Sequence, residues 1–214
     1  MRYAIFSDIH NNTTALSRIL TDADTRQVQA YLCLGDVGVD QCVELVRNRG
    51  AATVFGNWEV SNWRLLSPGN QRWALNLPPV RCYDGFWISH AAPVWPKQLG
   101  SLDQVVKNRR HLHLGGLFPY YLNVSDDLWR AFAELTAAGI PLLFHGHTHR
   151  QIGWSFTPDN RISRHAPVNL DLKPDHCYII GVGSVGQPKD FTGPAYIIFD
   201  AGAKRVEFIR LPEP

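Results

Sequence analysis

Apolar and polar positions alternate in blocks along the first part of the chain, and each apolar block ends in a glycine or a polar residue. The run 3–7 is a β-type segment that stops at the polar turn 8–14. Further strands are predicted over 31–34 and 52–55, with a helix over 39–48 between them. Residues at helical spacing predict another helix after the first turn: Ala15, Leu16, Ile19, Leu20 and Ala23. Strands alternating with helices favour a mostly parallel sheet covered by helices.

The middle of the chain is less regular. The pattern predicts a helix over 61–75, a strand over 86–89 and a loop-rich stretch over 91–124. Ser125 is placed to cap a helix over 126–138, which Gly139 ends. The apolar face of that helix consists of Leu128, Phe132 and Leu135. A strand over 141–144 follows it.

The hydrophobic period changes to two after residue 150. Candidate strands with this period are 152–156, 176–182, 195–200 and 205–211. Because no helical pattern separates them, antiparallel pairing is expected. The 214 residues contain no repeat or linker, so we predict a single domain over 1–214.

Composition and charge mainly serve to exclude classes of protein and partner. With 45% hydrophobic and 19% charged residues the chain is typical of a globular protein. Its net charge of +2 gives no reason to expect a nucleic-acid partner. Neither a membrane span nor a signal peptide is expected, because no apolar run is long enough. The cysteines lack metal-binding spacing and predict reduced thiols in a cytoplasmic protein: Cys33, Cys42, Cys82 and Cys177.

Polar side chains that can bind a metal follow five of the predicted strands. They are Asp8, His10, Asp36, Asn57, His90, His147 and His149. In α/β sheets ligands bind at the carboxyl ends of strands, so these side chains are expected to meet there. Carboxylate, imidazole and amide ligands without a thiolate suit Mn²⁺, Fe, Zn²⁺ or Ni²⁺ better than Ca²⁺. The set is too large for one tetrahedral ion, and a carboxylate such as Asp36 can bridge two ions ~3.5–4 Å apart.

The same residues form an ordered series of motifs: Asp8-x-His10, Gly35-Asp36, Gly56-Asn57, His90 and Gly146-His147-Thr148-His149. This series resembles that of the calcineurin-like metallophosphoesterases. The segment 183–190 resembles one common in their small bacterial and archaeal phosphodiesterase branch. The resemblance implies an α/β (α+β) fold with four layers, αββα, in which two β-sheets pack face to face and are flanked by helices.

The resemblance also implies a dinuclear metal centre. One ion would be held by Asp8, His10, Asp36 and His149. The other would be held by Asp36, Asn57, His90 and His147. Asp36 would bridge the ions, Asp36 and Asn57 would be catalytic, and Asn12 would contact substrate.

The implied activity is hydrolysis of phosphodiesters or phosphoanhydrides by a hydroxide held between two divalent ions, with Mn²⁺ the first choice. The expected partner is a small phosphorylated or nucleotide substrate, and a homo-oligomer is left open. Alternatives within the enzyme class are a dinucleoside polyphosphate hydrolase and a protein phosphatase. The rival class is a scaffold protein of this fold, as in a retromer subunit, but such a protein has no need to retain the full ligand set.

Trp58 departs from the family pattern. Many members have a histidine here that contacts phosphate or protonates the leaving group, and an indole has no proton that titrates near neutral pH. We therefore expect a preference for good leaving groups, such as phosphoanhydrides or activated diesters. Asn11 stands where glycine is common, and asparagine tolerates left-handed backbone better than other non-glycine residues.

Several other residues have two interpretations. Trp58, Trp63 and Trp73 either stack a nucleobase or pack in the core or in a subunit contact, and packing is preferred. A basic run either clamps phosphate or forms a solvated face, and the second is preferred. Its members are Lys107, Arg109, Arg110, His111 and His113. His145 either supports a ligand or is a buried structural histidine, whereas His165 and His176 are interpreted as structural.

Overall fold

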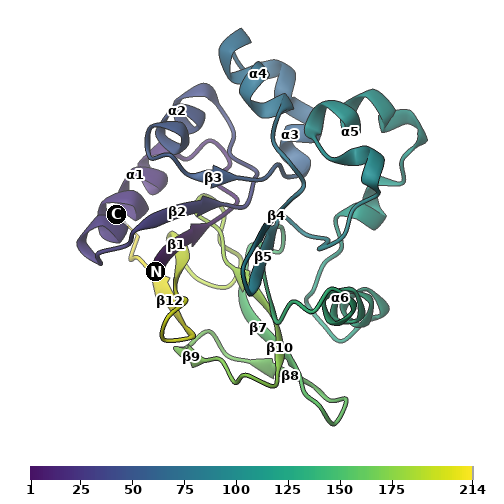
Figure 1. Cartoon of the computed structure of the whole chain (residues 1–214). Helices are drawn as coiled ribbons and strands as arrows, with labels where there is room; N and C mark the ends of the chain where they lie inside the picture. Colours follow the sequence, from purple (N-terminus) through teal and green to yellow (C-terminus); the bar gives the residue numbers. More distant parts are fainter. Residues whose placement is uncertain (214) are drawn as a thin grey trace.

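Twelve strands form two sheets in the computed structural model, which describes residues 1–213 (Figure 1). The strands are β1 (Arg2–Phe6), β2 (Ala30–Cys33), β3 (Ala52–Thr53), β4 (Val80–Tyr83), β5 (Phe86–Ser89), β6 (Leu142–His145), β7 (Gln151–Phe156), β8 (Ile162–His165), β9 (Leu170–Asp171), β10 (Cys177–Val182), β11 (Ala195–Asp200) and β12 (Arg205–Arg210). The first sheet has the order β3-β2-β1-β11-β12-β9, and the second has the order β4-β5-β6-β10-β7-β8.

Helices flank both sheets. They are α1 (Thr13–Thr25), α2 (Asp40–Asn48), α3 (Asn57–Asn62), α4 (Pro68–Leu75), α5 (Leu102–Asn108) and α6 (Asp126–Ala137). In Figure 1, α1 and α2 lie outside the first sheet, and α6 lies outside the second. The expected caps are present, since Asn12 accepts a hydrogen bond from the Ala15 amide and Ser125 accepts one from the Leu128 amide. Among the described residues, no helix has the length and apolar character needed to span a bilayer.

Strand direction explains where the site lies. β1, β2 and β3 are parallel neighbours, as are β5, β6 and β10. The predicted antiparallel pairing of the C-terminal half is confirmed for β7 with β10 and for β11 with β12. β11 also pairs antiparallel with β1, so a late strand of the chain lies beside the first one. The parallel strands therefore direct their carboxyl ends to the same edge of both sheets.

The central strands are buried on both faces. In β1, Ala4 and Phe6 join the cluster under the outer helices, whereas Ile5 joins the cluster between the sheets. In β10, Ile179 packs toward α6 and Ile180 packs between the sheets. Three apolar layers therefore separate four layers of secondary structure, which confirms the predicted αββα arrangement.

Several predicted element boundaries were wrong. The helix expected over 61–75 is interrupted, because Pro68 lacks an amide N–H and begins a new helix, α4, at its first position. The loop-rich stretch contains α5 and the 3₁₀ turns Lys97–Leu99, Arg109–His111 and Leu114–Leu117. Three strands were missed, β4, β8 and β9, and none of them has a fully buried residue.

Candidate metal centre

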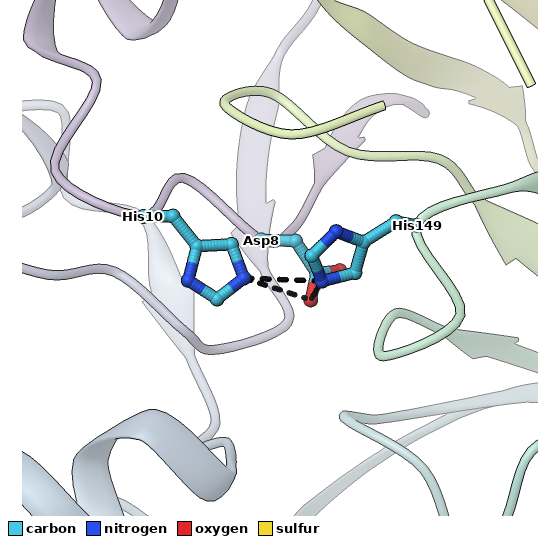
Figure 2. A group of neighbouring side chains, drawn as sticks. All are labelled: Asp8, His10 and His149. Atoms are coloured by element: carbon cyan, nitrogen blue, oxygen red, sulfur yellow. Dashed lines mark hydrogen bonds and ion pairs between the residues drawn. The ribbon is translucent and has the colours of Figure 1, made fainter. Parts of the chain in front are cut away.

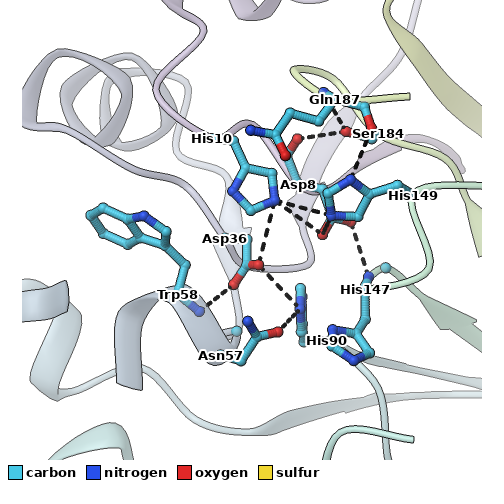
Figure 3. A network of polar contacts seen from close by, with 12 residues as sticks. Asp8, His10, Asp36, Asn57, Trp58, His90, His147, His149, Ser184 and Gln187 are labelled. Atoms are coloured by element: carbon cyan, nitrogen blue, oxygen red, sulfur yellow. Dashed lines mark hydrogen bonds and ion pairs between the residues drawn. The ribbon is translucent and has the colours of Figure 1, made fainter. Parts of the chain in front are cut away.

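The predicted ligands meet where β1, β2, β3, β5 and β6 end (Figure 3). All seven side chains singled out in the sequence lie in this one cluster: Asp8, His10, Asp36, Asn57, His90, His147 and His149. The two carboxylates are fully or almost fully buried. The sequence therefore predicted which residues the fold brings together, and their roles as ligands remain a prediction.

The backbone at these strand ends is strained. Asp8, His10, Asp36, His147 and His149 all have positive φ, between 46° and 62°. Left-handed backbone is uncommon for residues other than glycine and concentrates at functional sites. Asn11 adopts the same conformation at φ 67°, as expected for an asparagine that replaces a glycine.

Two glycines let the strand ends approach closely. A Cβ at Gly56 would overlap Asp36 Oδ1 and come within 2.8 Å of His90 Nδ1. A Cβ at Gly146 would overlap Ser7 Oγ and come within 2.7 Å of Asp8 Oδ2. These positions accept no side chain unless the ligand residues move.

One half of the cluster, which we call the first ligand group, consists of Asp8, His10 and His149 (Figure 2). Asp8 Oδ1 lies 3.2 Å from His149 Nε2 and 3.8 Å from His10 Nε2. The two Nε2 atoms are only 3.1 Å apart. Three atoms that can each donate a lone pair to a metal thus face one point.

Asp36 lies between this group and a second one, which consists of Asn57, His90 and His147. Its Oδ2 is 3.6 Å from His10 Nε2 and 3.6 Å from His90 Nε2. The backbone N–H of Trp58 donates to Asp36 Oδ1 at 2.7 Å, which fixes the carboxylate. One oxygen of Asp36 therefore faces both groups.

The second ligand group contains two facing acceptors. His90 Nε2 and Asn57 Oδ1 are 3.1 Å apart. The His147 ring lies 5.2 Å from the His90 ring, and its backbone N–H donates to Asp8 Oδ2 at 3.0 Å. This backbone hydrogen bond connects the second group to the first.

Carbonyl groups orient two of the imidazoles. His149 Nδ1 donates to the carbonyl of Gln187 at 2.8 Å, and His90 Nδ1 donates to that of Leu34 at 2.7 Å. A neutral imidazole that donates through Nδ1 keeps a lone pair on Nε2. This is the arrangement that orients a histidine toward a metal.

Glu59, which the sequence reasoning did not single out, supports the Asp36 turn. Its carboxylate is almost fully buried and accepts hydrogen bonds from three backbone amides. The donors are Asp36 at 2.9 Å, Val37 at 2.7 Å and Gly56 at 2.7 Å. The position of an acid two residues after Asn57 was the available signal, because a glutamate at the third helical position can accept from the N-cap amide.

Aromatic rings from the irregular stretch before α6 border the second group. Tyr120 is 54% exposed and its ring centroid lies 4.1 Å from that of His147. Phe118 is buried, and its ring centroid lies 5.9 Å from that of His90 and 5.8 Å from that of His147. The sequence reasoning missed both rings, because no periodic pattern assigns this stretch to the site.

Burial and neighbouring charges shift the acidities of the cluster. Burial by itself raises the pKa of Asp8, but the His149 and His90 imidazoles lower it to about 2. Burial raises the pKa of Asp36 to about 7, with the charges of Glu59 and Asp8 acting in the same direction and His90 opposing them. Burial lowers the pKa of His10 to about 4 and that of His147 to about 3. Burial acts in the same direction on His90 and His149, but the neighbouring carboxylates outweigh it and raise the pKa of both imidazoles. Two buried carboxylates among four imidazoles form a site that a cation stabilises.

The donor set fits divalent metal ions. Among the described residues, the buried atoms Asp8 Oδ1 and His147 Nε2 have no hydrogen-bond partner. Such atoms are costly to bury unless something binds them. The close Nε2 pair of His10 and His149 likewise needs a proton or a cation between its nitrogens. Oxygen and imidazole donors suit first-row divalent metals.

The other residues singled out in the sequence are not part of the ligand cluster. Trp63 and Trp73 pack against the hydrophobic core, which supports the packing interpretation, and the Trp58 indole lies to one side of the ligands in Figure 3. All side chains of the basic run are exposed. His145 is buried and donates to its neighbour Gly146, whereas Asn12 caps α1.

Comparison with known proteins agrees with this geometry. The family model of the calcineurin-like phosphoesterase superfamily domain matches residues 1–204. An uncharacterized protein of Methanocaldococcus jannaschii is 27% identical in an alignment 220 positions long, which covers 97% of this chain and 86% of that protein. The crystal structure of a metallophosphoesterase from Sphaerobacter thermophilus has a TM-score of 0.73 at 28% identity and covers 100% of this chain and 90% of that one.

A more distant structure shares the fold. A novel archaeal phosphodiesterase has a TM-score of 0.55 at 15% identity, and the match covers 99% of this chain and 100% of that one. The family model therefore accounts for nearly the whole chain, and the ligand motifs lie within the matched residues. This protein belongs to the calcineurin-like phosphoesterase superfamily.

Proposed function

We propose that this protein is a phosphoesterase that uses two divalent metal ions to hydrolyse phosphodiesters or phosphoanhydrides. The observation that carries the proposal is the position of Asp36 between the two ligand groups. Its Oδ2 lies 3.6 Å from an imidazole nitrogen of each group, those of His10 and His90. A carboxylate in this position can bridge two ions.

The first ion would be held by Asp8, His10, Asp36 and His149. The second would be held by Asp36, Asn57, His90 and His147. The mixed oxygen and nitrogen donors suit Mn²⁺, Fe, Zn²⁺ or Ni²⁺, and Mn²⁺ is our first choice. When bound, two such ions lower the pKa of a shared water toward ~7 and bind the phosphoryl oxygens.

The chain itself supplies fixed geometry. The Trp58 amide and the Glu59 carboxylate hold the Asp36 turn, and the carbonyls of Leu34 and Gln187 hold two imidazoles. Because these partners are already in place, little reorganisation is needed when a charged substrate binds. A small phosphorylated or nucleotide substrate suits a site recessed among strand ends.

Residue 58 limits the choice of leaving group. The Trp58 amide N–H donates a hydrogen bond to Asp36 Oδ1, and the indole cannot transfer a proton near neutral pH. A leaving group with little need of protonation departs more readily from such a site. This supports activated diesters and phosphoanhydrides, including dinucleoside polyphosphates, as substrates.

The four cysteines are free, and a reducing cytoplasm remains our proposed location.

The decisive experiment measures hydrolysis by metal-free protein before and after reloading with Mn²⁺. The substrates are bis(p-nitrophenyl) phosphate, p-nitrophenyl phosphate and a dinucleoside tetraphosphate. We expect turnover only with metal, and its loss in His149→Ala but not in His111→Ala, since His111 is exposed and outside the cluster. Protein that binds two ions yet hydrolyses none of these substrates would instead support a scaffold role.

A further inference from the structure

A cleft adjoins the metal centre on the side of the first ligand group. Its volume is about 560 Å³, and it lies between the start of α1 and the segment 185–194. Asn12 and Gln187 both line it. Gln187 also accepts the hydrogen bond from His149, and in Figure 3 its side chain lies beside His10. One wall of the cleft therefore directly contacts a candidate ligand of the metal centre.

We propose that this cleft binds a nucleoside, namely the ester substituent that stays on phosphorus when a phosphodiester is hydrolysed. The inference rests on the proposed function and specifies its substrate class. The volume falls within the ~300–1,000 Å³ typical of small-molecule sites. Its walls combine an aromatic ring with side chains that donate and accept hydrogen bonds.

Phe191 supplies the aromatic wall. The ring lines the cleft and is held from one side by Arg210, whose guanidinium carbon lies 5.1 Å from the ring centroid. Arg210 is itself anchored, since its Nε donates to Gln151 Oε1 at 2.8 Å and its Nη2 lies 3.5 Å from Asp190. A ring fixed in this way can stack on a nucleobase, because every base has a π-face.

Arg18 and Glu213 supply a donor and an acceptor of opposite charge in the same cleft. Arg18 Nη2 donates to the carbonyl of Pro212 at 2.8 Å, which holds the guanidinium in place. Sugar hydroxyls both donate and accept hydrogen bonds, so this pair suits the sugar of a nucleoside. A second phosphate could pair with the Arg18 guanidinium but would meet the Glu213 carboxylate, whereas a neutral sugar hydroxyl can pair with either side chain.

The position of the cleft favours the retained substituent over the leaving group. Trp58 occupies the position at which many family members protonate the leaving group, and it follows β3. The cleft lies at α1 and the segment 185–194 instead. In Figure 3, Gln187 and Trp58 lie on different sides of Asp36.

The test compares two esters with the same leaving group, thymidine 5′-(p-nitrophenyl phosphate) and methyl p-nitrophenyl phosphate. We expect wild type to prefer the thymidine ester, and Phe191→Ala to reduce the ratio of the two kcat/KM values about 10-fold. Phe191→Tyr keeps the aromatic face and should keep the ratio. Trp129→Ala, which removes an exposed ring on α6, is the matched control. An unchanged ratio in Phe191→Ala would overturn the inference, and so would a wild type without preference.

A binding measurement separates this inference from the proposed function. The Kd of thymidine 5′-monophosphate for Mn²⁺-loaded protein is measured by calorimetry and compared with that of inorganic phosphate. We expect the nucleotide to bind more tightly than phosphate in wild type. Its affinity should fall about 10-fold in Phe191→Ala. Binding with this pattern but no turnover of either ester would refute the esterase and retain the cleft. Equal nucleotide affinity in wild type and Phe191→Ala would reject the cleft, whatever the activity.

Discussion

The two halves of the metal centre are supported in different ways. The first ligand group is held by hydrogen bonds from the segment that follows β10. Ser184 donates to the backbone carbonyl of Asp8 at 2.8 Å, and the backbone carbonyl of Gln187 accepts from His149 at 2.8 Å. The second group has one such hydrogen bond, from His90 Nδ1 to the Leu34 carbonyl at 2.7 Å, and is otherwise bordered by rings, with the Tyr120 ring 4.1 Å from that of His147 and the Phe118 ring 5.9 Å from that of His90.

This difference has a physical consequence for binding. Hydrogen bonds fix the direction in which a ligand atom points, whereas a packed ring restricts an imidazole by contact and excludes water. The first half also adjoins a polar cleft lined by Gln187. We therefore expect mutations of the two supports to affect different ions, and mutations of the shared Asp36 turn to affect both.

Replacing the shared carboxylate should have the largest effect. Asp36→Asn removes the charge that faces both groups, and we expect kcat/KM to fall on the order of 1,000-fold, or about 4 kcal/mol of transition-state stabilisation. Metal content measured by mass spectrometry should fall below two ions per chain. Asp84→Asn, in an exposed turn, is the control and should retain both activity and metal. Two tightly bound ions in active Asp36→Asn would refute the shared role.

Removing the support beneath this turn should mainly cost stability. Glu59→Gln replaces a buried carboxylate that accepts from the amides of Asp36, Val37 and Gly56. Charge-assisted hydrogen bonds are lost and an amide N–H₂ is forced toward backbone donors, so we expect the free energy of unfolding to fall by about 3 kcal/mol. Urea denaturation of metal-free protein measures this.

The control for that experiment is Glu44→Gln, an exposed glutamate on α2. Its free energy of unfolding should change by less than about 0.5 kcal/mol. If Glu59→Gln behaved in the same way, the Asp36 turn would have to be held by other contacts.

A third pair of variants tests the comparison directly. Ser184→Ala removes the hydroxyl that donates to the Asp8 carbonyl and accepts from the Gln187 amide, both at 2.8 Å. We expect this to weaken one of two metal-binding steps by about 10-fold, the lower end of the range for residues that orient ligands. Tyr120→Leu should weaken the other step by less, because it removes a ring contact and no hydrogen bond to a ligand.

Calorimetric titration with Mn²⁺ resolves the two steps, and Tyr120→Phe, which keeps the ring, should behave as wild type. If both Ser184→Ala and Tyr120→Leu weakened the same step, the two halves would not be separately supported.

How well the strands and the site residues could be predicted from sequence depends on how deeply each strand is buried. The central strand β1 was identified by its apolar run and β10 by a period of two, although the structure buries side chains on both faces of each. The missed strands β4, β8 and β9 lie at sheet edges, where partial exposure removes the apolar pattern. The ligands were predictable because each follows a buried strand, and strand direction alone brings them together.

The supports of the site were harder to predict. Tyr120 reaches His147 from a stretch without periodicity, so only tertiary packing places it there. Ser184 lies in the segment 183–190, which a family resemblance marked without assigning roles to its residues, and Phe191 lies just beyond that segment. The sequence thus predicted which side chains meet at the site and missed most of those that orient them.

A change in substrate preference is expected at Trp58, whose backbone N–H donates to Asp36 and whose ring lies outside the ligand cluster. Trp58→His places a titratable imidazole where the indole lies, and a general acid assists poor leaving groups more than good ones. We expect kcat/KM for an alkyl phosphodiester to rise about 10-fold relative to Trp58→Phe, which removes the indole without adding an acid. For a p-nitrophenyl ester the two variants should differ less than about twofold. Equal gains on both esters would mean that the ring of residue 58 acts through shape alone, and that the preference for good leaving groups has another origin.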